Sequence, residues 1–277
     1  MALRFHKMHG LGNDFVILDA RQGAVAMDPA RARAIADRRT GVGCDQVIVL
    51  EPSDRADLRM RIWNADGGEV GACGNATRCV VLLEGRGLTI ETAGGLIEGT
   101  LDGAEVSIDM GEPRFGWAEI PLAYAMDTAA MPVGWETLRN PVAVNVGNPH
   151  VVFFVADLAA IDLARLGPLI ERDPLFPEGV NVNVAQFRIG GVNIGGARRM
   201  GVDLRVWERG AGLTRACGTG ACATAVAALR SRKASGPVGV FLPGGALTID
   251  WAPGGTIRMS GPATHVFSGE LAEGLGG

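Results

Sequence analysis

The chain has 277 residues, of which 47% are apolar and 20% charged, so it can build a packed core in one large or two medium domains and is not expected to be disordered. A net charge of −4, without any basic stretch, argues against nucleic acid as a partner. The apolar runs are far shorter than the roughly 18 residues of a membrane span, and Arg4, His6, Lys7 and His9 stand where a secretory signal would be apolar, so we expect a soluble, cytoplasmic protein.

The first predicted elements are a helix and a strand. Asp28 and Pro29 are typical of a helix start, with Asp as the N-cap and Pro at the first helical position, and we expect the helix to reach about Arg39. Further on, apolar side chains alternate with arginines over residues 58–62. This period of two predicts a strand with one buried face.

A Cys-Gly turn and an apolar helix come next. Cys73 and Gly74 precede residues 79–83, which are apolar on nearly all sides and therefore predict a buried helix. Beyond the helix we predict short strands separated by Gly-rich turns, at residues 88–92, 96–101 and 104–110. The Pro-rich segment 121–141 shows no clear pattern, and we expect it to connect two halves of the chain.

The second half of the sequence repeats the first. The pattern Arg-(Ile/Val)-Trp, followed nine positions later by Ala-Cys-Gly, starts at Arg61 and again at Arg205, and every member keeps the offset of 144 residues (217 − 73). Gly-Asn pairs at 12–13 and 147–148 form a weaker echo, offset by 135. Residues 202–206 again alternate as a strand, and 221–229 predict a second buried helix.

We therefore predict an α/β (α+β) protein of two pseudo-symmetric halves, each a curved, mainly antiparallel sheet that encloses a central helix. Residues 1–117, completed by 263–277, are expected to form the half that carries Cys73, and residues 118–262 the half that carries Cys217. The active site is expected in the cleft between the halves.

The repeated Cys-Gly turn indicates acid–base chemistry by thiols. A cysteine at the start of a helix lies among unpaired backbone N–H groups, which favour the thiolate and can also bind an anion such as a carboxylate. Two such turns facing each other would place one thiolate to remove a proton from a carbon and one thiol to deliver a proton to its other face. The product of that exchange is the inverted stereocentre.

Other interpretations remain open at this point. Cys44, Cys79 and Cys222 are predicted to be buried fillers, as most cysteines are, and a non-catalytic binding protein on a duplicated fold would make all five thiols ordinary. The spacings of zinc sites, of C-x-x-C oxidoreductases and of the G-x-S-x-G nucleophile turn are absent. Pyridoxal phosphate would require Lys7 or Lys233, the only lysines. We expect no cofactor and no metal ion.

Seven blocks of sequence carry a family resemblance. They are Met-His-Gly-Leu-Gly-Asn-Asp-Phe (8–15), Asn-Ala-Asp-Gly (64–67), Ala-Cys-Gly-Asn (72–75), Gly-Asn-Pro-His (147–150), Glu-Arg-Gly-Ala-Gly (208–212), Ala-Cys-Gly-Thr-Gly-Ala (216–221) and Gly-Pro-Ala-Thr-His-Val (261–266). Together they resemble the diaminopimelate epimerases over essentially the whole chain. The resemblance implies the fold of that family and a cofactor-independent, homodimeric isomerase that interconverts L,L- and meso-diaminopimelate for lysine and peptidoglycan precursors. A proline or hydroxyproline racemase, or a phenazine-pathway-like isomerase, is the alternative within the same architecture.

The resemblance also implies roles for individual residues. Cys73 and Cys217 would be the acid–base pair, with Cys217 the base and Cys73 the acid in the L,L-to-meso direction, and His150 and Glu208 would support them as catalytic residues. The helix-start amides would hold the reacting carboxylate. The substrate-binding residues implied are Asn13, Gln46, Asn64, Gly74, Asn75, Asn148, Asn181, Glu208, Arg209, Gly218 and Thr219.

Overall fold

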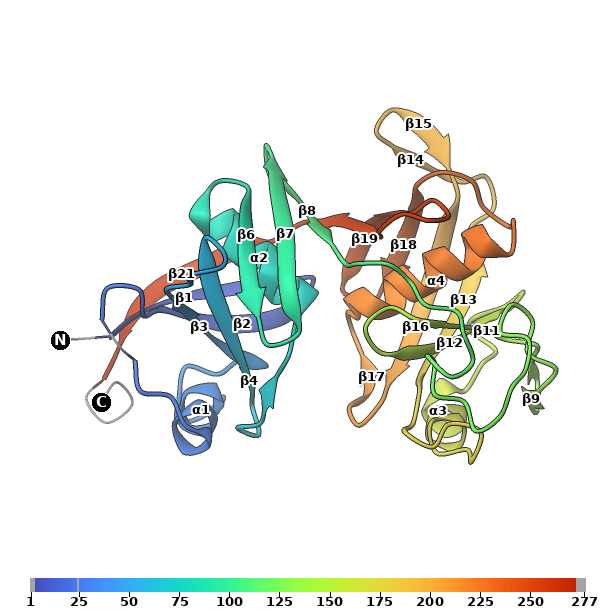
Figure 1. The fold of residues 1–277 in the computed structure, drawn as a ribbon, viewed down its shortest axis with the longest axis horizontal. Helices are drawn as coiled ribbons and strands as arrows, with labels where there is room; N and C mark the ends of the chain where they lie inside the picture. Colours follow the sequence, from blue (N-terminus) through green and yellow to red (C-terminus); the bar gives the residue numbers. More distant parts are fainter. Residues whose placement is uncertain (1–2, 24, 273–277) are drawn as a thin grey trace. The chain divides into compact units, whose positions relative to one another are not determined.

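The computed structural model describes residues 3–23 and 25–272, and the chain divides into two compact units (Figure 1). One unit comprises Met1–Ile108 with Gly261–Gly277, and the other Asp109–Ser260. The sequence placed these boundaries at 117/118 and 262/263, whereas the units divide at 108/109 and 260/261. Residues 273–277 of the segment expected to complete the first half lie outside the described residues.

In the first unit, a sheet of mixed direction lies around helix α2 (Gly74–Glu84), which contacts β1, β7 and β21. Only the pairs β2–β3 and β4–β6 are parallel, and the other pairs with a described register are antiparallel. Helix α1 (Pro29–Ala36) packs on β3 and β4. The strands are β1 (Leu3–Gly10), β2 (Asn13–Asp19), β3 (Gln46–Glu51), β4 (Leu58–Asn64), β5 (Glu69–Val70), β6 (Leu88–Thr92), β7 (Gly95–Asp102), β8 (Glu105–Asp109) and β21 (Thr264–Leu271).

The second unit is built in the same way around helix α4 (Gly218–Arg230), which contacts β11, β12, β13, β16, β18 and β19. Helix α3 (Leu163–Glu171) packs on β13, β16 and β17. Two small hairpins, β9–β10 and β14–β15, lie outside the main sheet. The strands are β9 (Gly134–Trp135), β10 (Leu138–Arg139), β11 (Val142–Asn145), β12 (Pro149–Phe154), β13 (Asn181–Phe187), β14 (Val192–Ile194), β15 (Ala197–Arg199), β16 (Gly201–Glu208), β17 (Gly212–Thr214), β18 (Val238–Leu242), β19 (Gly245–Asp250) and β20 (Arg258–Gly261).

The strand registers explain the two offsets of the sequence repeat. Phe15 lies opposite Gln46 in the parallel pair β2–β3, and His150 lies opposite Asn181 in the parallel pair β12–β13, with both partners shifted by 135. In the next pair, Val47 opposite Trp63 corresponds to Val182 opposite Trp207, with shifts of 135 and 144. The nine additional residues therefore lie between β13 and β16, where the hairpin β14–β15 stands. The predicted class, two pseudo-symmetric halves that each enclose a central helix, is confirmed.

Two local predictions are corrected by the structure. Helix α1 ends at Ala36 instead of Arg39, because the Asp37 carboxylate accepts hydrogen bonds from the amides of Arg39 and Thr40 and turns the chain. Residues 121–141 do not connect the halves. They belong to the second unit, where Leu122, Met131 and Leu138 are buried in one apolar cluster.

Helix α3 was not predicted from the sequence, because it contains Gly167 and Pro168. Both residue types normally weaken a helix interior. A Cβ atom at Gly167 would lie 2.4 Å from the Trp207 ring, so the glycine is what lets the helix pack on β16. The alternating strands at 58–62 and 202–206 and the two buried helices are confirmed.

Candidate active site

Each unit presents one cysteine at the first turn of its central helix. Cys73 and Cys217 are the N-cap residues of α2 and α4, with extended backbone (φ −150° and −131°) before the helices begin at Gly74 and Gly218. The first backbone N–H groups of a helix have no acceptor within the helix. Both thiols therefore lie beside groups that attract negative charge.

The neutral amide of Asn13 lies beside the Cys73 thiol. The thiol lies 3.9 Å from Oδ1 of Asn13, which also accepts a hydrogen bond from Asn75 Nδ2 at 3.1 Å. The buried Asn75 accepts in turn from Arg78 Nη2 at 2.8 Å. Gly10 packs against this pair, since a Cβ atom there would lie 3.1 Å from Arg78 and 3.2 Å from Asn75. The contacts fix the orientation of Asn13 beside the sulfur.

A charged cluster holds Asn13 from its other side. Asn13 Nδ2 donates to Asp45 at 2.9 Å, and Asp45 is hydrogen-bonded to the backbone and carboxylate of Asp14. Burial raises the pKa of the Asp14 carboxyl, but hydrogen bonds from Arg38 and Lys7 outweigh it and hold that pKa well below its usual value. Asp14 is therefore ionised at neutral pH, and the cluster stays assembled.

Gln46 and Asn64 lie side by side where β3 and β4 pair. Gln46 Nε2 donates to Asn64 Oδ1 at 2.8 Å. The Oε1 atom of Gln46 is buried without a hydrogen-bond partner among the described residues. A buried oxygen left unpaired is unfavourable, so this atom is a ready acceptor for a ligand N–H group.

Around Cys217 the neighbours differ. Its sulfur accepts a hydrogen bond from the Gly220 amide at 3.3 Å and lies 3.5 Å from Thr219 Oγ1. Burial, followed by the charge of Glu208, raises the pKa of the Cys217 thiol well above its usual value. Burial also raises the pKa of Glu208, although hydrogen bonds from Thr214 and Cys217 oppose that effect. Cys217 is therefore a neutral thiol next to a carboxylate of increased basicity.

His150 lies fully buried in a chain of hydrogen bonds. Asn183 Nδ2 donates to His150 Nδ1 at 3.0 Å, so the ring carries its proton on Nε2 and donates to Asn148 Oδ1 at 2.8 Å. Burial lowers the pKa of His150 to about 3, and the positive charge of Arg209 acts in the same direction. The imidazole is neutral and orients Asn148.

Asn183 is a residue that the sequence analysis missed. Its Oδ1 is buried without a partner among the described residues, and a Cβ atom at Gly220 would lie 2.8 Å from that oxygen and 3.2 Å from the Cys217 sulfur. A signal was present, because Asn181 and Asn183 alternate with Val182 and Val184 at the start of the strand and so share one face. Asp45 and Thr214 were missed as well, and their sequence context carried no signal.

Asn181 and Arg209 form the polar edge of the second unit's site. Asn181 Nδ2 donates to the Pro149 carbonyl at 2.8 Å, and its Oδ1 accepts from the Arg209 amide at 3.0 Å. The Arg209 guanidinium donates to the Glu178 carbonyl at 2.7 Å and forms no ion pair with any residue that the structure describes. It therefore keeps most of its donors for an external anion.

The structure thus gathers the predicted residues into one group in each unit. Asn13, Gln46, Asn64, Cys73, Gly74 and Asn75 belong to the first, and Asn148, His150, Asn181, Glu208, Arg209, Cys217, Gly218 and Thr219 to the second. The remaining cysteines are fillers as predicted: burial raises the pKa of Cys44 to about 11 and that of Cys79 to about 12, and Cys222 is fully buried.

Neither a metal site nor a membrane-spanning helix is found in residues 3–23 and 25–272. They contain no group of three or more His, Cys, Asp or Glu side chains placed to hold a metal ion. None of their helices combines the length and apolar character that crossing a bilayer requires.

The chain is similar to known proteins over nearly its whole length. A family model described as diaminopimelate epimerase matches residues 5–116 and 142–266. A diaminopimelate epimerase from Rhizorhabdus wittichii is 65% identical, covering 98% of this chain and 96% of its own, and one from Zymomonas mobilis is 56% identical, covering 98% and 97%.

Solved structures with the same fold are more distant. A phenazine biosynthesis protein of the PhzF family from Bacillus anthracis matches with a TM-score of 0.67 at 16% identity, covering 98% of this chain and 99% of its own. A hydroxyproline epimerase from Agrobacterium vitis, with bound trans-4-hydroxy-L-proline, gives 0.66 at 16% identity, covering 100% and 96%. These likenesses confirm the fold, while the two epimerases above carry the more specific identification.

Proposed function

The chain belongs to the diaminopimelate epimerase family and is an isomerase of lysine biosynthesis, and from this premise we propose that Cys73 and Cys217 exchange the proton at the α-carbon of diaminopimelate. The observation that carries the proposal is the same in both units: a cysteine that caps the central helix, followed by glycine. Inversion requires a base on one face of the carbon and an acid on the other, and the two thiols supply that pair.

In the proposed mechanism the sulfur atoms carry the proton and the helix starts hold the charge. One thiolate removes the α-proton, negative charge spreads from the carbon into the adjoining carboxylate, and the other thiol delivers a proton to the opposite face. The amides at Gly74–Asn75 and Gly218–Thr219 are proposed to hold that carboxylate. The dipoles of these amides stabilise the negative charge that develops on the carboxylate in the transition state, and stabilising the transition state speeds the reaction.

The surroundings of Cys217 suggest how that thiol changes between acid and base. In the free enzyme it is protonated, which suits it to deliver a proton. To act as the base for L,L-diaminopimelate it must first lose its proton. Glu208 is placed to accept it, since the raised pKa of Glu208 makes that carboxylate a better acceptor than an ordinary one. His150 has both ring nitrogens occupied, and we assign it a positioning role through Asn148.

The distal end of the substrate carries a second ammonium and carboxylate, and we assign its carboxylate to Arg209. Replacing Arg209 with Ala should lower kcat/KM for diaminopimelate by about 10- to 100-fold, because a charge-assisted hydrogen bond contributes about 1.5–3 kcal/mol. The alkylation rates of the thiols should stay within about twofold of the parent protein. Arg172→Ala, which removes another exposed arginine of the same unit, is the matched control. An unchanged kcat/KM in Arg209→Ala would remove Arg209 from substrate recognition.

The identity of the substrate is tested by assaying three candidate amino acids side by side. Purified protein without added cofactor should invert L,L-diaminopimelate and leave L-proline and trans-4-hydroxy-L-proline unchanged. Circular dichroism or chiral chromatography follows each conversion. Turnover of proline without turnover of diaminopimelate would assign the chain to the racemase alternative instead.

Assembly and compartment are proposed on separate grounds. Val266 and Phe267 on β21 are about half exposed (53% and 47%), and covering such apolar side chains favours a homodimer, which sedimentation of the purified protein would detect. The mechanism proposed above requires Cys73 and Cys217 in the reduced form. A mechanism that depends on reduced thiols favours the cytoplasm.

A further inference from the structure

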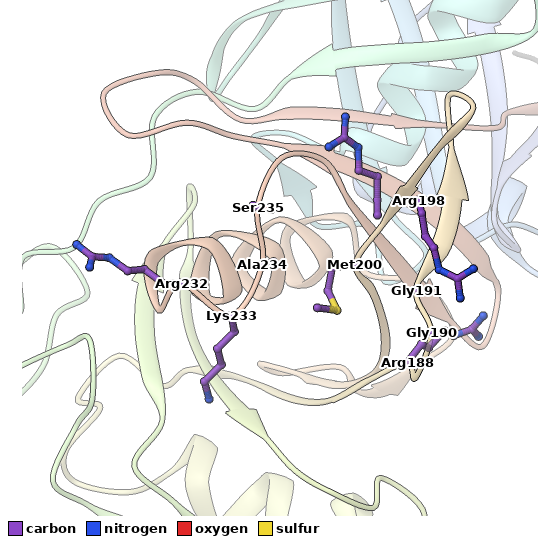
Figure 2. Close-up of a pocket in the computed structure, with 10 residues that line it drawn as sticks. Arg188, Gly190, Gly191, Arg198, Met200, Arg232, Lys233, Ala234 and Ser235 are labelled. Atoms are coloured by element: carbon purple, nitrogen blue, oxygen red, sulfur yellow. The ribbon is translucent and has the colours of Figure 1, made fainter.

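A cationic hollow lies in the second unit, far along α4 from Cys217. It has a volume of about 520 Å³, and its lining contains Arg188, Arg198, Arg199, Arg232 and Lys233 but no acidic side chain. Figure 2 shows Arg188 and Arg198 beside the hairpin, Arg232 and Lys233 beyond the end of α4, and Met200 between them. Cys217 caps the opposite end of this helix, about 20 Å away for 13 residues at 1.5 Å each.

Of the five basic side chains of this hollow, one is neutralised by an ion pair among the residues that the structure describes. Arg188 pairs with Asp203 at 2.7 Å, but Arg198, Arg199, Arg232 and Lys233 form no ion pair with any residue that the structure describes. Lys233 lies over the Phe154 ring at 4.8 Å, a contact that holds the ammonium without cancelling its charge. Five of the 26 basic residues thus surround one hollow in a chain of net charge −4. Their mutual repulsion is relieved when an anion binds.

Two features of the hollow differ from the equivalent described residues of the first unit. Its hairpin, β14–β15, accounts for the nine residues by which the second half exceeds the first between the equivalent strands. At the end of the central helix, the first unit places Gly85 in the left-handed region (φ +67°), whereas the second places Arg232 there (φ +56°). That conformation is unfavourable for arginine and costless for glycine. The end of α4 therefore has a charged residue, Arg232, in a strained conformation, whereas the end of α2 has the neutral Gly85.

We propose that this hollow binds a small anion bearing two or more phosphate groups. Its volume lies within the roughly 300–1,000 Å³ of small-molecule sites. Guanidinium groups match phosphate oxygens with paired hydrogen bonds, and several unpaired cations favour a ligand of multiple charge. A zwitterionic amino acid such as diaminopimelate has too little net charge to be held here, and a cationic one is repelled.

Titration calorimetry of the full-length protein with tripolyphosphate and with ATP tests the proposal. Saturable binding of either anion, weakening as salt is raised, is the expected result. Binding of both alike would identify the phosphates as the recognised group, and binding of ATP alone a nucleoside polyphosphate. No saturable binding of either at low salt would overturn the proposal. A second result would also overturn the proposal. If single-stranded oligonucleotides bind more tightly than both anions, with an affinity that rises with their length, the hollow is part of an extended surface.

Two variants and a matched control locate the binding. Arg198→Ala and Arg232→Gly should each weaken the affinity about tenfold or more, while Arg139→Ala, an exposed arginine of the same unit, should leave it within about twofold. Arg232→Gly should also keep or raise the urea midpoint, since glycine suits that conformation. All three variants should retain epimerase activity, because none lies in the catalytic groups. Equal weakening by Arg139→Ala would show non-specific charge attraction and refute the site.

Discussion

Replacing Cys73 or Cys217 with Ala is expected to abolish net epimerisation of diaminopimelate. A positioned acid or base contributes roughly 10²- to 10⁴-fold to a rate, and inversion should fall by at least that factor in either variant. The reason is geometric, since one face of the α-carbon then has no partner for its proton. The remaining thiol should still exchange the α-proton of one stereoisomer with deuterated solvent, slowly and without inversion.

The two cysteine variants are distinguished by the isomer that each labels. Mass spectrometry of deuterium in L,L- and meso-diaminopimelate should find opposite preferences in Cys73→Ala and Cys217→Ala. Cys79→Ala and Cys222→Ala are the controls, because each removes a buried thiol further along the same helix. They should keep near-native rates. A Cys73 or Cys217 variant that still inverts at a near-native rate would point to a single base and refute the paired mechanism.

Acidification is expected to destabilise the protein through His150. Its pKa is about 3 in the folded protein and about 6.5 when unfolded. The unfolded state therefore binds a proton that the folded state excludes, and the stability present above pH 6.5 is lost as the pH falls toward 3. At 1.36 kcal/mol per pKa unit, the total loss is about 5 kcal/mol, and about 2 kcal/mol of it should appear by pH 5.

Urea denaturation at pH 7 and pH 5 measures this loss. His150→Gln has no titrating ring, so its free energy of unfolding should change by about 2 kcal/mol less over the same interval than that of the parent protein. His265→Gln removes an exposed histidine and should follow the parent. A parent and His150→Gln with equal pH slopes would show that the buried imidazole is not kept neutral by the fold.

Several features of this protein were predictable because they repeat or have a short period. The Cys-Gly turns at Cys73 and Cys217 recur with one offset, and a duplicated fold has little reason to keep such a turn twice unless both are used. The apolar stretches after them predicted buried helices, and the period of two at 58–62 predicted a strand, since burial follows local periodicity. The wider set of binding residues was implied by family resemblance, because a single Asn beside Gly is most often a turn residue.

Other features depend on contacts between distant parts of the chain. Asp45 holds Asn13 from 32 residues away, and Asn183 fixes the His150 tautomer from 33 residues away. Helix α3 forms despite Gly167 and Pro168 because the glycine fits against Trp207, which local propensity does not record.

The sequence by itself determined the class of fold, its duplication and the two thiols that we propose for the reaction, since each is written in a local pattern that occurs twice. Only the tertiary structure decided the protonation of the site. Burial makes His150 neutral, keeps Cys217 a thiol and makes Glu208 basic. Burial and charge proximity are properties of the folded chain, because the groups that cause these pKa shifts meet only when the strands pair.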